Sequence, residues 1–378
     1  MNMLLPNVCR IQYGYPFDSA KFSSDTGVPL IRIRDVVRGF SETYTTEECS
    51  EDYLVNDGDM LIGMDGEFNI AHWKGGKAYL NQRVCKLIPN NEVDALYLYY
   101  FMPKALKVIE DKTPFVTVKH LSARELNKVV VPIPSMEEQK KISGSLRKVD
   151  ELVALRKEQL AKLDQLVKSR FIELFGDMLL NDMGWQEDAL DTLADVVSGI
   201  TKGRKIRETD LIEVPYMAVS NVKDGYIDWT TVKTIMATKQ EIEQYRLLPY
   251  DVLMTEGGDP DKLGRGAVIT TPLENSIHQN HIFRVRLQTE RVLPVYFSEY
   301  LQHQKAKRYF LRCAKQTTGI ASINMKQLRA LPVLVPPLEL QEQFAAFVEQ
   351  TDKSKFDLKQ SLEKLEMLKK SLMQQYFG

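Results

Sequence analysis

The sequence predicts an α+β protein with two repeated mixed α/β domains, separated by two long helices that form an antiparallel coiled coil with pseudo-two-fold symmetry. Three observations support this prediction. Segments of the first half recur in the same order in the second half, short strand-like runs fill the first part of each copy, and a long helical pattern fills the rest. The expected boundaries are 1–134 and 179–334 for the domains, and 135–178 and 335–378 for the helices.

Length and composition are those of a globular chain with two domains. The 378 residues are 44% hydrophobic and 27% charged, which is enough for two cores. There are 50 Lys and Arg against 51 Asp and Glu. Because a freely acting nucleic-acid binder is usually basic, any affinity for DNA must come from a local patch or from partners.

Cysteine usage and the amino-terminal residues suggest a cytoplasmic protein. The four cysteines form no C-x-x-C pair, so neither a structural zinc site nor a disulfide scaffold is expected, and free thiols suit a reducing compartment. The first residues have no basic segment followed by a long apolar one, and no run approaches 18 apolar residues. We therefore expect neither a signal peptide nor a membrane span.

The repeat is diverged but colinear. Matching segments are 8–11 with 196–199, 29–35 with 215–221, 59–61 with 251–253, 96–98 with 295–297, 131–139 with 335–343, and 169–176 with 371–378. The separation between matching segments drifts slowly while their order holds. Such drift is typical of a duplicated unit after loop insertions, because loops tolerate changes of length.

The first part of each copy is rich in strands. Short apolar or alternating runs predict strands at 30–37, 60–64, 84–88 and 129–133, and at 216–222, 252–255, 267–270, 282–287 and 332–335. Helical spacing predicts one helix in each copy, at 94–109 and 295–312. Residues 185–190 form a lead-in to the second copy, whereas the first copy begins almost at its first strand. We expect the first domain to be trimmed there or completed by the other end of the chain.

The second part of each copy is a long helix. Apolar residues recur at alternating steps of four and three residues through 136–175, at Ile142, Leu146, Val149, Val153, Leu160, Leu163, Val167 and Leu174, with Arg156 and Arg170 in the two missing slots. Phe344, Val348, Leu358, Leu362, Leu365, Leu372 and Tyr376 repeat the pattern. This spacing predicts a coiled-coil seam, antiparallel because a whole domain lies between the helices. Each helix would span roughly 50–60 Å, over which B-DNA passes roughly 15 base pairs.

Two similar domains on a rigid spacer suit the reading of a split DNA site, since the spacer sets the distance between half-sites. At this point the sequence resembles the specificity subunit (HsdS) of type I restriction–modification systems over its whole length. The segments that carry the resemblance are 251–266 and 279–285, their first-copy versions 59–66 and 80–84, and the Val-Pro to Glu-Gln helix starts at 131–139 and 335–343.

The resemblance implies a target-recognition domain for each half of a bipartite site in double-stranded DNA. It also implies that two methyltransferase (HsdM) subunits bind the helical regions and methylate adenine, and that restriction and translocase (HsdR) subunits join them. S-adenosylmethionine, ATP and magnesium would belong to those partners, so that this chain would bind no cofactor and carry out no catalysis.

Basic residues provide the first candidates for DNA contact. Arg32, Arg34 and Arg38 alternate with apolar residues, so on a strand they would form one basic face. The densest basic cluster consists of Lys202, Arg204, Lys205 and Arg207. These side chains either contact phosphates, which positions a domain without reading sequence, or lie on a solvated loop.

Two further segments are candidates. The glycine-rich run 257–266 lacks the order of a phosphate-binding loop or a calcium loop, so it is either a turn between strands or a DNA contact through Lys262 or Arg265. Asn81, Gln82 and Arg83 match Gln279, Asn280 and His281 at a strand entrance. Such amides can pair with adenine and arginine with guanine, but their likeness in both copies favours a partly structural role. His278 and His281 lack a third ligand nearby, so no metal site is expected.

Glu138 and Gln139, and Glu342 and Gln343, fall in the first turns of the long helices. They either suit the helix dipole or help to dock methyltransferase subunits.

Two other function classes compete with DNA recognition. An adenine methyltransferase would need an Asn or Asp followed by Pro-Pro-Tyr or Pro-Pro-Phe, and residues 335–338 have only the prolines. Asp261 could begin a nuclease motif, but no properly spaced acidic residue and lysine follow it. A coiled-coil adaptor that binds proteins would differ from a DNA reader in salt dependence, because phosphate contacts weaken steeply with salt.

Overall fold

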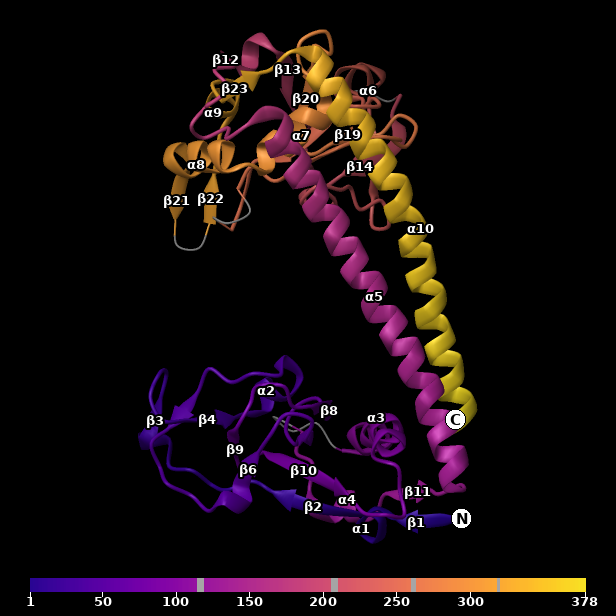
Figure 1. The fold of residues 1–378 in the computed structure, drawn as a ribbon. Helices are drawn as coiled ribbons and strands as arrows, with labels where there is room; N and C mark the ends of the chain where they lie inside the picture. The colour runs from indigo at the N-terminus through magenta and orange to yellow at the C-terminus, as the bar shows by residue number, and fades with distance from the viewer. Residues whose placement is uncertain (114–118, 205–209, 260–262, 318–319) are drawn as a thin grey trace. The chain divides into compact units, whose positions relative to one another are not determined.

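The computed structural model describes residues 1–113, 119–204, 210–259, 263–317 and 320–378. The chain divides into two compact units. The first comprises Met1–Lys157 with Gln360–Gly378, and the second comprises Glu158–Lys359. Both long helices, α5 (Met136–Phe175) and α10 (Leu338–Phe377), contribute to both units. Each unit is therefore a globular domain with one end of each helix (Figure 1).

The first unit is built on two small sheets. One is antiparallel, in the order β2 (Cys9–Tyr13), β10 (Val84–Pro89), β7 (Met60–Gly63) and β8 (Asn69–His72). The other has the order β3 (Phe22–Ser23), β5 (Tyr44–Thr45), β4 (Val28–Ile31), β9 (Ala78–Leu80) and β6 (Leu54–Val55). A separate pair joins β1 (Asn2–Leu4) to β11 (Val130–Pro132). Its helices are α1 (Leu5–Val8), α2 (Ile33–Arg38), α3 (Ala95–Lys112) and α4 (Ala123–Asn127), with 3-10 turns at Ser19–Lys21 and Glu51–Tyr53.

Helix α3 forms the main core with the β2–β10–β7–β8 sheet. The side chain of Asp94 caps its first turn by accepting a hydrogen bond from Tyr97 N at 2.8 Å. Tyr97, Leu98 and Met102 are buried against sheet residues such as Ile62. Burial of each such side chain stabilises the fold by about 1.5–3 kcal/mol.

The second unit repeats this arrangement with longer connections. Its antiparallel sheet has the order β13 (Ala194–Ser198), β20 (Ile282–Leu287), β16 (Val252–Thr255) and β18 (Gly266–Val268). Two three-stranded sheets follow, β15 (Lys233–Ala237), β14 (Ile212–Met217) and β19 (Ile277–His278), and β17 (Gly257–Gly258), β22 (Ile320–Ser322) and β21 (Lys315–Thr317). β12 (Gln186–Ala189) pairs with β23 (Pro332–Val335). The helices are α6 (Lys239–Tyr245), α7 (Pro294–Gln302), α8 (Gln304–Cys313) and α9 (Met325–Arg329), with 3-10 turns at Leu190–Thr192 and Val219–Asn221.

The long helices run antiparallel in each unit, which confirms the predicted coiled coil. In the first unit, Lys369 Nζ lies 2.6 Å from Asp150 Oδ1, and Lys157 Nζ lies 3.2 Å from Glu366 Oε1. In the second, Lys355 Nζ lies 2.7 Å from Asp164 Oδ1. Residue numbers on α10 therefore decrease as those of their partners on α5 increase.

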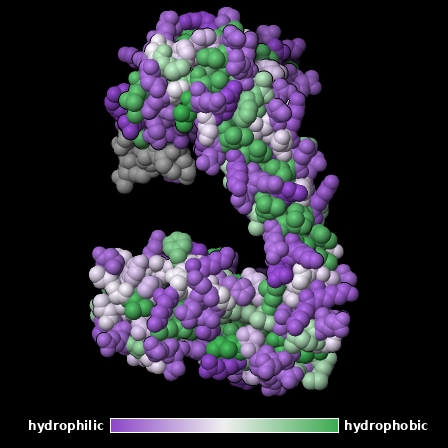
Figure 2. All heavy atoms as spheres, in the orientation of Figure 1, coloured by the Kyte–Doolittle hydropathy of each residue, from purple (hydrophilic) through white to green (hydrophobic). Residues whose placement is uncertain are grey.

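Apolar side chains also remain exposed on these helices (Figure 2). They are Leu152, Leu155, Met367 and Leu368 in the first unit, and Leu166, Ile172 and Phe356 in the second. Among the described helices, none is long and apolar enough to cross a membrane.

Each domain is completed by the far end of a helix. Phe175, near the end of α5, packs against Tyr296 of the second unit with ring centroids 4.8 Å apart. Phe377, near the end of α10, packs against Tyr97 of the first unit at 5.3 Å. The expectation that the other end of the chain completes the first domain is confirmed. β1 pairs with β11 as β12 pairs with β23, so the first domain has its own counterpart of the strand in the second copy's lead-in.

The structure corrects the register of the repeat at both ends of a copy. The Tyr97 hydroxyl donates to Pro132 O at 2.9 Å, and the Tyr296 hydroxyl donates to Leu334 O at 2.8 Å, so Pro132 corresponds to Leu334 rather than to Pro336. Near the start, β2 and β13 end at Tyr13 and Ser198, each followed by the equivalent glycine. The sequence match was displaced by a few residues in both places because short Val and Pro runs align in several registers.

Three predicted elements differ clearly from those observed. The strand expected at 216–222 ends at Met217, and a 3-10 turn at Val219–Asn221 follows it. The strand expected at 30–37 ends at Ile31, and helix α2 follows it. The helix expected at 295–312 is two helices that meet at His303, whose backbone is extended. Strands at 252–255, 282–287 and 332–335 and the helix at 136–175 have their predicted bounds.

Candidate nucleic-acid interface

The matching polar turns, residues 81–83 and 279–281, lie at the same place in both domains. Asn81 forms a parallel bridge with Tyr15, and Gln279 forms one with Ile200. The preceding Gly14 is needed for this approach, since a Cβ there would lie 2.1 Å from Asn81 O. Gly199 is equally constrained, with a Cβ lying 1.9 Å from His278 O. The turn is thus held by backbone contacts, which supports the structural part of the sequence interpretation.

Side chains of these turns differ in exposure. Gln82, Arg83 and His281 are exposed, whereas Asn81, Gln279 and Asn280 are half-buried. The exposed members can reach a ligand without rearrangement of the fold. They remain predicted contacts.

In the first domain, Arg83 belongs to a charged cluster. Asp65 Oδ1 lies 2.5 Å from His120 Nδ1, and Asp65 Oδ2 lies 3.5 Å from Arg83 Nε. Arg83 also reaches His120, with 3.3 Å between Nη1 and Nδ1. The carboxylate is mostly covered, with 21% of its side chain exposed, while the two partners are about half exposed. One anchored carboxylate therefore orients two outward side chains.

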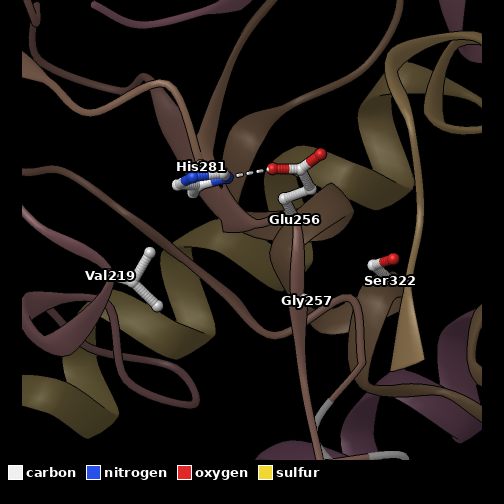
Figure 3. A pocket seen from close by; sticks show the side chains of 5 residues that line it. All are labelled: Val219, Glu256, Gly257, His281 and Ser322. Atoms are coloured by element: carbon white, nitrogen blue, oxygen red, sulfur yellow. Dashed lines mark hydrogen bonds and ion pairs between the residues drawn. The ribbon is translucent and has the colours of Figure 1, made fainter. Parts of the chain in front are cut away.

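In the second domain, His281 borders a hollow. Its Nδ1 lies 2.5 Å from Glu256 Oε2, and Figure 3 shows the ring pointing at that carboxylate. The hollow holds about 360 Å³ and is lined by Val219, Glu256, Gly257, His281 and Ser322. Small residues at Gly257 and Ser322 leave this space beside the contact of His281 with Glu256 (Figure 3).

Sequence reasoning missed Asp65, His120 and Glu256. Asp65 precedes Gly66 and Glu256 precedes Gly257 within two of the segments that carry the family resemblance, which was a usable signal. His120 lies 55 positions from its partner Asp65, and no local pattern indicates that contact.

The arginines of residues 32–38 do not share a strand face, and that prediction is wrong. Arg32 is the N-cap of α2, while Arg34 and Arg38 lie on the helix. All three side chains are exposed. Part of the charge is offset, because Arg38 lies 3.3 Å from Glu42 and Arg34 lies 3.7 Å from Asp35.

The second basic cluster divides into a structural arginine and an exposed lysine. Arg204 lies 2.5 and 2.6 Å from the two oxygens of Glu241 and donates to Met236 O. Hydrogen bonding to Glu241 raises the pKa of Arg204 and lowers that of the carboxyl. Lys202 is exposed. Lys205 and Arg207 lie outside the described residues.

Within the glycine-rich run, Lys262 lies outside the described residues and Arg265 is half-buried. The buried Nε of Arg265 finds no acceptor among the residues described. Gly264 has φ of +72°, and a Cβ there would lie 2.3 Å from the Phe310 ring. Gly264 therefore packs closely on α8, and β17, at the start of the run, pairs with β22.

At the starts of the long helices, Gln139 has a structural role. Its Oε1 accepts from Asp94 N at 2.8 Å, and its Nε2 donates to Glu92 O and Pro134 O. In the second unit the equivalent residue is Gln341, which bonds Leu293 N, Arg291 O and Pro336 O in the same way. Both amides are buried, whereas Glu138, Glu342 and Gln343 are exposed. Only the exposed three are left as predicted docking residues.

No group of three or more His, Cys, Asp or Glu residues among those described could hold a metal ion. His278 and His281 do not act together, since His278 is fully buried and bonds Ile282 O.

Comparison with known proteins identifies relatives along nearly the whole chain. The type I restriction modification DNA specificity domain matches residues 2–165 and 183–369. The type I restriction enzyme EcoBI specificity subunit of Escherichia coli is 27% identical over 380 residues, covering 93% of this chain and 78% of that protein.

Solved structures share the fold. The S subunit of a type I restriction–modification system from M. genitalium matches with a TM-score of 0.59 and 14% identity, covering 99% of this chain and 94% of that one. A chain from a structural study of complex assembly in the type I R-M system matches with a TM-score of 0.57 and 16% identity, covering 100% and 97%.

Proposed function

The chain belongs to the family of type I restriction–modification DNA specificity subunits, and we propose that it reads a bipartite target in double-stranded DNA with one domain per half-site. The observation that carries this proposal is the repeated frame. Both domains support an exposed polar turn, at Arg83 and at His281, on equivalent backbone contacts. Two such turns in one chain suit a site with two specific halves.

We further propose that two methyltransferase (HsdM) subunits dock on the helix pair and that HsdR subunits join them. Exposed apolar residues such as Leu155, Phe356 and Met367 support this assignment, because a helix pair that only spaced two domains would gain nothing from them. The chain itself would be non-catalytic and cytoplasmic. S-adenosylmethionine, ATP and Mg²⁺ would be bound by the partners.

The proposal is tested by co-expressing the chain with the methyltransferase subunit of its own operon and mapping methylated adenines across the genome. The expected result is a split motif, with two short specific blocks around a fixed gap. Exchange of residues 179–334 for those of a relative should change one block and leave the other. Complex formation without sequence-specific methylation would contradict DNA reading by these domains.

A further inference from the structure

The two domains share the same backbone contacts around Arg83 and His281, which we call the frame, but carry different side chains there. Met64 N donates to Arg83 O, as Glu256 N donates to His281 O, each at 3.0 Å. Met64 O accepts from Leu121 N, as Glu256 O accepts from Ile323 N. The backbone equivalence is therefore Met64 with Glu256 and Arg83 with His281.

The neighbouring bridges complete this equivalence. Asp65 pairs with His120, and Gly257 pairs with Ser322. Asp65 thus corresponds to Gly257, and His120 to Ser322. The hollow beside His281 in the second domain is, in the first, the place of the Asp65 and His120 side chains.

Residues that hold the frame are the same in both copies. Asp59 and Asp251 each accept from the backbone N–H three residues earlier, and Gln139 and Gln341 tie the helix starts identically. At the position of Arg83 and His281, the four backbone sites carry different side chains in the two copies. A domain pair that reads two different half-sites needs this division. The frame sets where each domain sits on the DNA, and the base contacts determine which sequence it reads.

We propose, on the basis of the proposed function, that Arg83 and His281 each contact the edge of one base pair, and that Asp65 and Glu256 are the positioning residues that aim them. The proposed ligand is a base edge in a DNA groove. Arg83 would donate to guanine acceptors, which is the commonest specific contact of arginine. His281 would present Nε2, since Glu256 takes Nδ1.

The charges favour a base edge over a phosphate. A cation such as Arg83, if it served only to attract phosphate, would be weakened by a carboxylate at 3.5 Å. For a neutral base edge, the same carboxylate restrains a flexible side chain before binding and so lowers the entropic cost of the contact. Arg83 and His281 keep about half of their side-chain surface exposed, which leaves them open to a ligand.

The test uses the full-length chain and a library of random DNA duplexes, from which bound duplexes are selected and sequenced. Variants are Glu256→Gln, His281→Arg and Asp65→Asn, and the control is Glu290→Gln, an exposed carboxylate of the second domain. We expect Glu256→Gln to reduce base discrimination about tenfold at one position of one half-site. We expect His281→Arg to shift that position toward guanine, and Asp65→Asn to affect one position of the other half-site only.

Each outcome has a distinct meaning. Equal weakening on every duplex would identify phosphate contacts and overturn the inference, as would an unchanged motif in all three variants. If the wild-type chain selects no split motif, the proposed function fails and the inference fails with it. The thermal unfolding of each variant should match that of the control, because the substituted side chains lie at the surface or leave the frame bonds intact.

Discussion

At the scale of single residues, His278 makes the second domain sensitive to acid. Burial is the main cause that lowers its pKa to about 4, against about 6.5 in an unfolded chain. The unfolded state binds more protons between these values, so stability is complete above about pH 6.5 and is lost as the pH falls toward 4. The loss should reach about 3 kcal/mol.

Urea unfolding at pH 7.5 and pH 5 measures this loss. We expect wild-type protein to lose stability between these conditions, and His278→Gln to lose clearly less, although it starts from a lower value. An identical pH slope in both proteins would show that another group titrates instead.

Glu299 has the opposite effect on the pH dependence of stability. Burial raises the pKa of its carboxyl; Lys168 and Lys355 lower it in part, and Asp164 and Asp224 add to the rise. Its stabilising contribution is complete below the unfolded pKa and declines as the pH rises through the folded one. Glu299→Gln should therefore raise the melting temperature relative to wild type by more at pH 8 than below the unfolded pKa of about 4.3. Glu290→Gln, on the surface, should show no such trend in differential scanning fluorimetry.

At the scale of elements, the far end of α10 is an integral part of the first domain. Phe377 is 7% exposed and contacts Tyr97 and Phe101. Phe377→Ala should destabilise the first unit by about 3 kcal/mol, because it leaves a cavity in the core. Hydrogen exchange should then speed up in α3 while the second unit keeps its protection. Leu368→Ala, which truncates an exposed side chain of the same helix, should leave exchange unchanged.

The same scale explains what the sequence could and could not predict. Helix α5 was predictable because its apolar period is sustained over forty residues. Helix α2 was mistaken for a strand, since its six residues, Ile-Arg-Asp-Val-Val-Arg, are too few to separate a helical period from a strand period. Its cap signals are local: Asp35 Oδ2 accepts from Arg32 N at 2.8 Å, and Gly39 ends the helix at φ of +79°.

The candidate site was only partly predictable for a different reason. The exposed turns at Arg83 and His281 are visible in the sequence because they repeat. Their partners Asp65, His120 and Glu256 depend on strand pairing between segments far apart in the chain. Pairing of this kind is set by the whole fold rather than by local pattern.

At the scale of the whole molecule, the proposed function implies that the length of the helix pair sets the gap between the two half-sites. Insertion of seven residues after Lys157 in α5 and after Lys359 in α10 would keep the four-three seam of both helices. Each helix would lengthen by about 10 Å, which is about three base pairs of DNA. We expect the selected motif to keep both blocks and to widen its gap by about three positions. Binding should weaken, because three base pairs also turn one block by roughly a quarter of a turn around the DNA axis. An insertion in α5 alone should instead unpair the seam and lower the melting temperature. If the variant with both insertions selects a motif whose gap is unchanged, the helices do not set the spacing.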